Sequence, residues 1–457
     1  MEEKIIGFIE KYKSQSDYMD IRLEESSGTS IEIVNGRLSV LNKSNNKGGI
    51  VRVLYNGAWG VVSFNDLDNI EEFILSAIKQ AKLTGEENSA LAPVEVIQDK
   101  VLLELINDPR NIKLKEKIDL LSEYNNIAYN YNKKIKSARV RYSEIFSNLT
   151  FISSEGANIY QEKMDLGGGI GVTAVEGDNS QSTAVGFGTS NDYNCVLGLE
   201  GSIKEQCEIA LQLLEAPKVK SGNYTVITDS ELTGVFVHEA FGHLSEGDNV
   251  YENKDLADIM VIGREFGRKI LNIYDSGLDK GKRGYLKYDD EGVRTEKTYL
   301  IKEGKLVGRL HSRTTAGKMG ERATGSGRAT SYIYSPIPRM RNTVIECGTS
   351  TFEEMIKDVS LGILACGSGG GQTSGDNFTF SAAYGYIIRD GKVCELVRDV
   401  NLVGNVFETL KNIDMIGNED TSHDSGGGCG KGDQFPLPVS DGGPRIRIQN
   451  MIVGGDI

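Results

Sequence analysis

The 457-residue sequence lacks the features of a membrane-spanning, secreted or nucleic-acid-coating protein. No apolar run approaches the ~18 residues that a bilayer-spanning helix needs. Lysine and arginine (51) are outnumbered by aspartate and glutamate (65), and the net charge of −14 argues against broad contact with nucleic acid or an anionic membrane. The opening residues Met1-Glu2-Glu3-Lys4 lack the basic start of a secretory signal.

Cysteine and proline are also scarce, whereas glycine is abundant. The six cysteines include no Cys-x-x-Cys pair, which is typical of reduced thiols rather than a disulfide framework. The 8 prolines fall below the usual ~5%, while the 54 glycines exceed the usual ~7%. Without a Gly-X-Y period, this excess indicates hairpins and loops that approach a ligand closely. We therefore expect a folded cytoplasmic protein with no nucleic-acid or membrane partner.

Length and patterning predict an α+β fold in two parts. Residues 1–218 read as an N-terminal region of helices mixed with antiparallel sheet, with a possible sub-boundary near 84–95, where periodicity is absent. Residues 219–457 read as a mostly antiparallel β domain with glycine-rich loops and one embedded helix. The stretch from Pro217 to Gly222 is the best candidate for the boundary between them.

Local signals place several elements within these parts. Asn35-Gly36 and Asn56-Gly57 each separate two strand-like runs, and Asn-Gly supplies the two positive φ angles of a type I′ hairpin turn. Further hairpin turns are predicted at residues 302–305 and 389–392. Apolar periodicity predicts N-terminal helices over residues of about 70–81, 112–131 and 203–215.

Two of the four histidines lie in the segment His238-Glu239-Ala240-Phe241-Gly242-His243. A capping box, in which Thr228 accepts and Glu231 reaches back, predicts a helix from about residue 229. The zincin motif His-Glu-x-x-His places its imidazoles about 40° apart around a helix, whereas one more residue places them about 140° apart. Both can therefore bind one metal only if the helix widens or ends between them, and Gly242 could allow a π-bulge or unwinding.

The chemistry of such a site requires more than two histidines. Glu239, beside a ligand, could take a proton from water whose pKa zinc lowers towards ~7. By itself the pattern is weak, and two surface histidines on a helix are the alternative. A catalytic zinc needs a third protein ligand and an open position. The candidates are His311, His423, a carboxylate or a cysteine, of which Cys429 stands out because its loop is rich in glycine.

These residues resemble the TldD/PmbA family of zinc metallopeptidases. The resemblance starts with the histidine segment followed by Glu246-Gly247-Asp248 and extends over essentially the whole chain. Further blocks in family order are Asp289-Asp290-Glu291-Gly292, Thr324-Gly-Ser-Gly-Arg328, Pro338-Arg339-Met340, Gly369-Gly-Gly-Gln372, Leu402-Val403-Gly404-Asn405 and Cys429-Gly430-Lys431-Gly432.

The resemblance carries expectations about site, activity and assembly. Because the histidine motif and the late cysteine are both present, the chain resembles the metal-bearing TldD-like subunit rather than the PmbA-like one. It implies that His238, His243 and Cys429 bind Zn²⁺ and that Glu239 is the catalytic glutamate. It also implies a peptidase that hydrolyses small or unfolded peptides, within a heterodimer formed with a PmbA-like companion. A homodimer is the alternative assembly.

Other functions remain to be weighed against a peptidase. Zinc could be structural in an assembly or binding subunit, with His423 or Asp424 as a fourth ligand. Cys429 could instead be a nucleophile activated by a histidine. A Walker-type nucleotide site is excluded, because Ser425 replaces its first glycine and Gly432 its Ser or Thr.

The two remaining histidines have open roles. His311 could polarise a scissile carbonyl or make a structural hydrogen bond. His423 lies in an acidic loop, and we expect no catalytic role for it.

Overall fold

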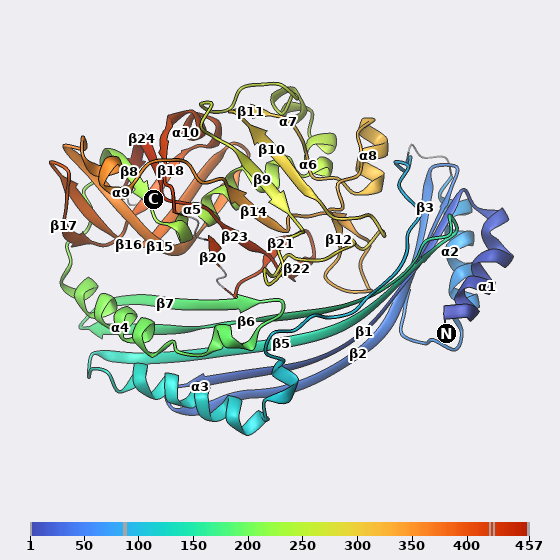
Figure 1. Cartoon of the computed structure of the whole chain (residues 1–457), viewed down its shortest axis with the longest axis horizontal. Coiled ribbons are helices and arrows are strands. Elements are labelled where there is room, and N and C mark those ends of the chain that lie inside the picture. The colour runs from blue at the N-terminus through green and yellow to red at the C-terminus, as the bar shows by residue number, and fades with distance from the viewer. Residues whose placement is uncertain (1, 86–88, 420–421, 424–425, 455–457) are drawn as a thin grey trace.

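A long, curved seven-stranded sheet dominates the N-terminal half of the chain (Figure 1). The computed structural model describes residues 2–85, 89–419, 422–423 and 426–454. The strand order is β3-β2-β1-β5-β6-β4, with β7 paired to β6. The strands are β1 (Tyr18–Val34), β2 (Arg37–Tyr55), β3 (Ala58–Phe64), β4 (Gln98–Val101), β5 (Ile135–Ser153), β6 (Asn158–Glu176) and β7 (Asn179–Thr189).

The Asn-Gly hairpin turns are confirmed. Asn35 and Gly36 have φ of 50° and 75°, and Asn56 and Gly57 have φ of 49° and 76°. The strands they join are longer than predicted, since β1 starts at Tyr18 and pairs with both β2 and β5. The middle of β1 is polar and lacks the apolar alternation of a strand. Its pairing with the two neighbouring strands keeps it extended, which local patterning could not indicate.

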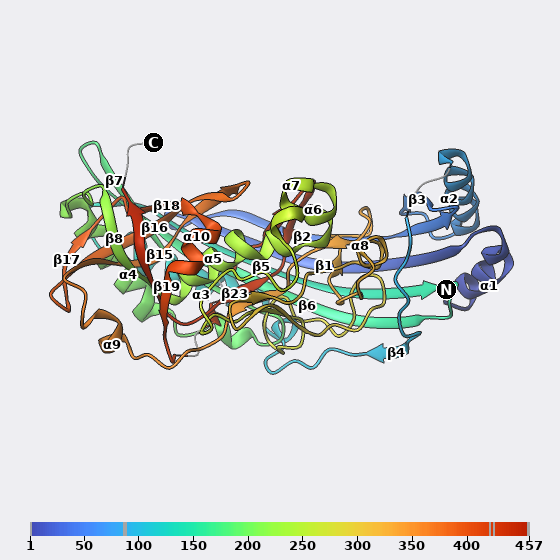
Figure 2. The ribbon, with the colours of Figure 1, turned by 90° about the horizontal axis from the view of Figure 1, so that it is seen from above.

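Helices cover the two ends of this sheet. At one end α1 (Glu2–Tyr12) and α2 (Ile70–Thr84) share a core with β1, β2 and β3. At the other end α3 (Leu114–Tyr129) and α4 (Glu200–Glu215) share a second core with β1, β5, β6 and β7. The three predicted N-terminal helices are thereby confirmed. Figure 2 shows α1 and α2 beyond the edge of the C-terminal body, at the far end of the sheet.

The C-terminal body is built on two further sheets. In the first, β8, β15, β16, β18 and β24 form a closed ring, because β15 pairs with both β8 and β16. This sheet comprises β8 (Gly222–Thr228), β15 (Leu361–Ser374), β16 (Asn377–Arg389), β17 (Lys392–Val397), β18 (Asn401–Asn405), β19 (Ile413–Ile416) and β24 (Ile446–Val453). The second comprises β9 (Ile273–Ser276), β10 (Lys297–Lys302), β11 (Lys305–Leu306), β14 (Asn342–Ile345), β20 (Ser422–His423) and β23 (Ser440–Gly442).

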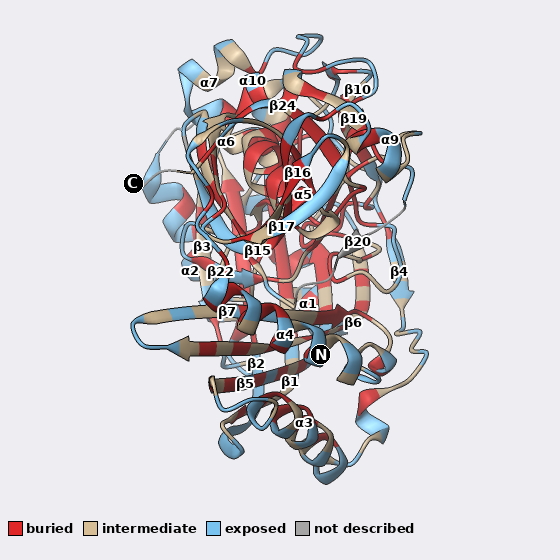
Figure 3. Cartoon of the chain, turned by 90° about the vertical axis from the view of Figure 1, so that its left-hand side faces the viewer, coloured by how far each residue is buried: buried red, intermediate tan, exposed pale blue. Residues whose placement is uncertain are grey.

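The helix α5 (Ser230–Val237) follows β8 directly and contacts strands of both C-terminal sheets. Most pairings here are antiparallel, as predicted, and the turns at 302–305 and 389–392 are confirmed. Two small ribbons complete the strands, β12 (Gly327–Arg328) with β13 (Ile337–Pro338) and β21 (Cys429–Lys431) with β22 (Gln434–Leu437). The α+β fold class is therefore confirmed, and Figure 3 shows the buried residues gathered inside this body and along the strands.

The C-terminal body contains more helices than the single one expected. They are short, and two of them begin with capping boxes at Ser312 and Thr351 that glycine-rich patterning did not reveal. Besides α5, the described residues form α6 (Gly247–Glu252), α7 (Lys254–Ile259), α8 (Arg313–Met319), α9 (Phe352–Ile356) and α10 (Val406–Asn412). None of the helices in the described part of the chain is long and apolar enough to cross a membrane.

Ion pairs join the C-terminal body to the long sheet. Arg52 of β2 lies 2.5 Å from Asp20 of β1 and 3.0 Å from Glu291 of the C-terminal body, and its side chain is 5% exposed. Arg313 of α8 lies 2.8 Å from Glu155, whose side chain is 40% exposed. Removing one partner of a buried pair costs roughly 3–5 kcal/mol, so the Arg52–Glu291 contact holds the body in one position over the sheet.

The predicted domain boundary between residues 218 and 219 stays a prediction. The possible sub-boundary near 84–95 also stays a prediction, and residues 86–88 within it lie outside the described residues.

Candidate metal centre

The helix that carries the histidines begins one residue later than the predicted capping box. Asp229 is the N-cap, and its carboxylate accepts a hydrogen bond from the Leu232 amide at 2.9 Å. Thr228 is the last residue of β8, and its hydroxyl lies 2.6 Å from that of Thr233. Glu231 accepts from the Ser368 amide of β15 instead of reaching back. The predicted cap was wrong because Thr228 still belongs to the strand.

The helix widens between the two histidines, as the spacing required. After Val237 the chain forms a π-helical turn, His238–Gly242, in which the His243 amide donates to the His238 carbonyl. This i→i+5 bonding brings residues five apart close together. Gly242 lets this turn pack closely against Met340, since a Cβ there would lie 2.0 Å from the Met340 sulfur.

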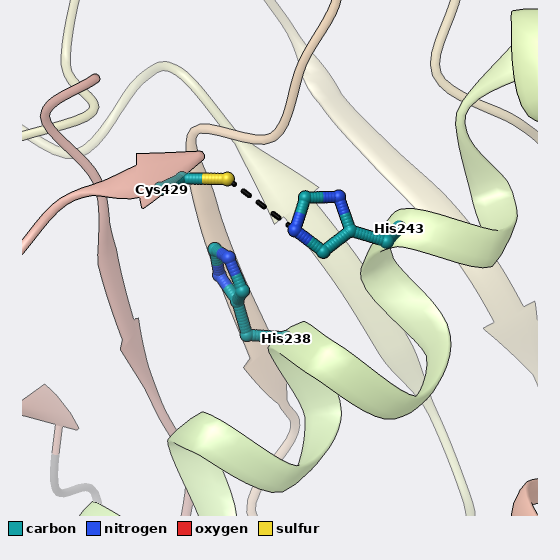
Figure 4. Close-up of side chains that lie close together, drawn as sticks. All are labelled: His238, His243 and Cys429. Atoms are coloured by element: carbon teal, nitrogen blue, oxygen red, sulfur yellow. Dashed lines mark hydrogen bonds between the residues drawn. The ribbon is translucent and has the colours of Figure 1, made fainter. Parts of the chain in front are cut away.

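Cys429 of β21 completes a three-residue cluster with these histidines. Its Sγ lies 3.4 Å from His243 Nε2, and the two residues are 186 positions apart in sequence. The imidazole rings of His238 and His243 have centroids 5.2 Å apart and are nearly perpendicular, at 89°. One donor atom from each residue lies within 4.8 Å of the other two. Figure 4 shows the cysteine and both rings converging on one point.

Without an ion, the electrostatics of the cluster favour a thiolate beside a protonated histidine, so a metal ion would replace the proton that His243 holds. Burial raises the pKa of the Cys429 thiol, but contacts with His238 and His243 outweigh it and lower that pKa to about 5. Burial lowers the pKa of His243, but the Glu246 charge and the contact with Cys429 raise it to about 10. His238 Nδ1 is buried without a hydrogen-bond partner in the described part of the chain. A thiolate with two imidazoles is a donor set that fits zinc rather than magnesium or calcium.

Glu239 lies next to the cluster with its carboxylate unengaged. The structure gives this side chain no hydrogen bond or ion pair with any described residue, although its backbone carbonyl accepts from Thr373 at 3.2 Å. It is half-buried, as are Glu231 and Val235 at intervals of four along the same helix. Residues four apart share a helix face, so Glu239 continues the stripe that those two residues form.

Two members of that stripe, Glu231 and Val235, line a cavity of about 720 Å³ between α5 and the long sheet, together with Ser368 of β15. The opposite side is formed by strands of the long sheet and includes five glycines of β6 and β7, which are Gly167, Gly168, Gly169, Gly171 and Gly186. The loop that precedes Cys429 reaches the same cavity through Gly426 and Gly427. The lining of this cavity includes none of His238, Glu239, His243 and Cys429; it comes nearest to them in sequence at Val235, which precedes His238, and at Gly427, which precedes Cys429.

The other candidate ligands lie elsewhere or outside the described residues. His311 is 1% exposed, and its Nδ1 and Nε2 lie 3.0 Å from Thr315 and from Glu321. These contacts agree with a structural hydrogen-bonding role for His311. His423 lies in β20, and its backbone pairs with that of Asp441 in β23. The side chain of His423 is not described. Asp424 is outside the described residues altogether, so a fourth ligand from this loop stays a prediction.

Sequence reasoning did not assign a role to several residues that hold the cluster in place. Glu246 contacts His243, and Lys431 contacts Glu246, although both were noted only as motif members. Arg339, fully buried, donates to the Cys429 carbonyl at 2.9 Å. Arg283 donates to the Gly427 carbonyl and pairs with Asp165 of β6 at 2.7 Å. For Glu246, Lys431 and Arg339 the available signal was their proximity in sequence to the ligands or their place in the motif blocks, whereas Arg283 carried no such signal.

Models of known families match most of the chain. The PmbA/TldA metallopeptidase C-terminal domain matches residues 221–455, domain 1 matches residues 19–81, and the central domain matches residues 107–273. A metalloprotease from Synechocystis sp. is 41% identical over 449 residues, covering 98% of this chain and 97% of that protein. A zinc metalloprotease TldD homolog from Saccharolobus solfataricus is 29% identical, with 96% and 97% covered.

Solved structures share the fold at low sequence identity. TldE from Thermococcus kodakarensis superposes with a TM-score of 0.78 at 17% identity, covering 99% of this chain and all (100%) of that one. A protein from Thermotoga maritima superposes with a TM-score of 0.80 at 20% identity, with 99% and 100% covered.

Proposed function

We propose that this chain, which belongs to the TldD/PmbA family of metallopeptidases, hydrolyses peptide bonds of small or unfolded peptides with the help of zinc. The observation that supports this most directly is the convergence of His238, His243 and Cys429. Glu239 follows His238 on the same π-helical turn, and its carboxylate has no hydrogen-bond or ion-pair partner among the described residues. Three protein ligands leave a tetrahedral zinc one open position, which is the arrangement of catalytic rather than structural sites.

In this proposal each residue has a distinct task. His238, His243 and Cys429 hold the ion, and zinc bound there supplies a Lewis acid that makes water nucleophilic near neutral pH. Glu239 accepts the proton of the attacking water and delivers it to the departing amine. A thiolate ligand donates more charge to the ion than a third imidazole would, so we expect modest turnover.

The cavity beneath α5 suits an extended peptide. β8 pairs with β15 only at residues 362–365, and the Gly367 and Ser368 amides donate to Asp229 and Glu231. From Gly369 onward, the side of β15 opposite β16 has no strand partner among the described residues. A peptide can add to such an edge through backbone hydrogen bonds, which tolerate many side chains. This supports a preference for unfolded segments over folded proteins.

The experiment that tests this function is removal and return of the metal. We expect peptide cleavage to stop after dialysis against a chelator and to return with about one equivalent of Zn²⁺, since a tetrahedral site of this kind holds one ion. Elemental analysis of the same samples should follow the activity. A chain that cleaves peptides equally well without metal would support the cysteine-nucleophile alternative instead.

The width of the cavity offers a second test. A Cβ at Gly171 would meet nothing within 4 Å, so Gly171→Val should fold normally while narrowing the cavity. We expect kcat/KM for peptides to fall about tenfold or more, the usual effect of a mismatched group in a pocket. Gly7→Ala, at an equally open glycine in α1, is the control. Unchanged kcat/KM in Gly171→Val would argue that peptides bind elsewhere.

We also propose that the active form contains a second chain, either a PmbA-like companion or another copy. The likeness of the fold to TldE supports a companion of the same architecture.

A further inference from the structure

Two charged residues lie directly behind the candidate ligands. Glu246 follows the His243 turn, and its Oε2 lies 3.1 Å from His243 Nδ1. Lys431 lies on β21, the strand that carries Cys429, and its Nζ lies 2.9 Å from the same Glu246 oxygen. A continuous chain of contacts therefore runs from the strand of the sulfur ligand to the ring of one nitrogen ligand.

Burial makes this chain of contacts rigid. The Glu246 side chain is 0% exposed and that of Lys431 is 15% exposed. Lys431 Nζ also lies 2.6 Å from Asp248 Oδ1 and 3.1 Å from the Pro338 carbonyl. Asn249 donates to the His243 carbonyl at 2.7 Å, which fixes the backbone of the same turn. Strand and turn are thus joined by polar contacts that water scarcely reaches.

We propose that Glu246 and Lys431 are positioning residues for the metal, an inference that rests on the proposed zinc function. With metal bound, Glu246 accepts a hydrogen bond from the Nδ1–H group of His243, which leaves Nε2 as the nitrogen available to the ion. Lys431 holds the Cys429 strand against the turn and balances the Glu246 charge, which would be costly if buried alone. The pair thereby brings a nitrogen and a sulfur from distant segments to bonding positions.

The Lys117–Glu144 pair provides an internal comparison. It is also buried, with side chains 4% and 7% exposed and a 2.6 Å contact. Glu144 contacts Tyr142 at 2.5 Å, and neither member contacts a candidate metal ligand in the described structure. A substitution in this pair should affect folding stability alone, whereas one in the Glu246–Lys431 pair should also change metal binding.

The test measures zinc affinity and coordination geometry rather than turnover. In the full chain, Glu246→Gln and Lys431→Met are each titrated with Zn²⁺ against a chelating dye. We expect the zinc Kd to rise about 10–100-fold, as for other outer partners of metal ligands. The visible spectrum of the Co²⁺-substituted variants should shift as the ligands move. Lys431→Arg keeps the cation and should restore affinity, while Glu144→Gln should lower Tm without changing Kd or spectrum.

Two results separate this inference from the proposed function. If Glu246→Gln and Lys431→Met fold, bind zinc as tightly as the wild type and keep its Co²⁺ spectrum, the positioning role is overturned and the peptidase proposal stands. If the wild-type chain itself binds no zinc, both are overturned. Should Lys431→Met fail to fold, as circular dichroism would show, Glu246→Gln and Lys431→Arg still carry the comparison.

Discussion

Glu239→Gln should abolish most peptide hydrolysis while leaving the metal in place. A general acid–base residue contributes about 10²–10⁴-fold to the rate, and we expect kcat to fall within that range. Glutamine has nearly the same size and cannot accept the proton of the attacking water. The Glu239 carboxylate has no partner among the described residues, so its replacement breaks no visible hydrogen bond and should cost little stability.

The measurement compares kcat and zinc content in the same preparation. Glu252→Gln, at an exposed carboxylate of α6, is the matched control and should keep wild-type kcat. Peptide cleavage at the wild-type rate by zinc-loaded Glu239→Gln would contradict the proposed mechanism. A loss of zinc together with activity would instead assign Glu239 to holding the metal.

Cys429→Ser is expected to weaken zinc binding more than Glu246→Gln or Lys431→Met. Residues that hydrogen-bond to a metal ligand contribute about 10–100-fold to metal affinity. Loss of a direct sulfur ligand should therefore raise the zinc Kd by more than about 100-fold. The physical reason is that a serine hydroxyl keeps its proton near neutral pH, whereas contacts with the two histidines lower the pKa of the Cys429 thiol to about 5. Peptide cleavage should fall in parallel.

Competition with a chelating dye measures this affinity, and the matched control is Cys394→Ser, at an exposed cysteine of β17. The control should bind zinc as the wild type does. If Cys429→Ser kept wild-type zinc affinity, the third ligand would have to come from elsewhere, and His423 and Asp424 would be the next residues to substitute.

Local chemistry made parts of the fold predictable. The turn at Asn35-Gly36 could be placed because only a few residue types accept its positive φ angles. The π-helical widening before His243 could be inferred, since an ideal helix would point the two rings apart. The N-cap was misplaced by one residue, at Thr228, because both Thr and Asp can cap and only the end of β8 decides between them.

The sequence by itself determined the family, the fold class, the hairpin turns and the need for a widened helix. These features depend on residue types and on the spacing between residues close in sequence, both of which can be read directly from the chain. Only the tertiary structure decided that Cys429 lies 3.4 Å from His243, that β15 closes a ring of strands and that Lys431 reaches Glu246. Each of these joins segments far apart in sequence, and their pairing depends on the packing of the whole body rather than on any local pattern.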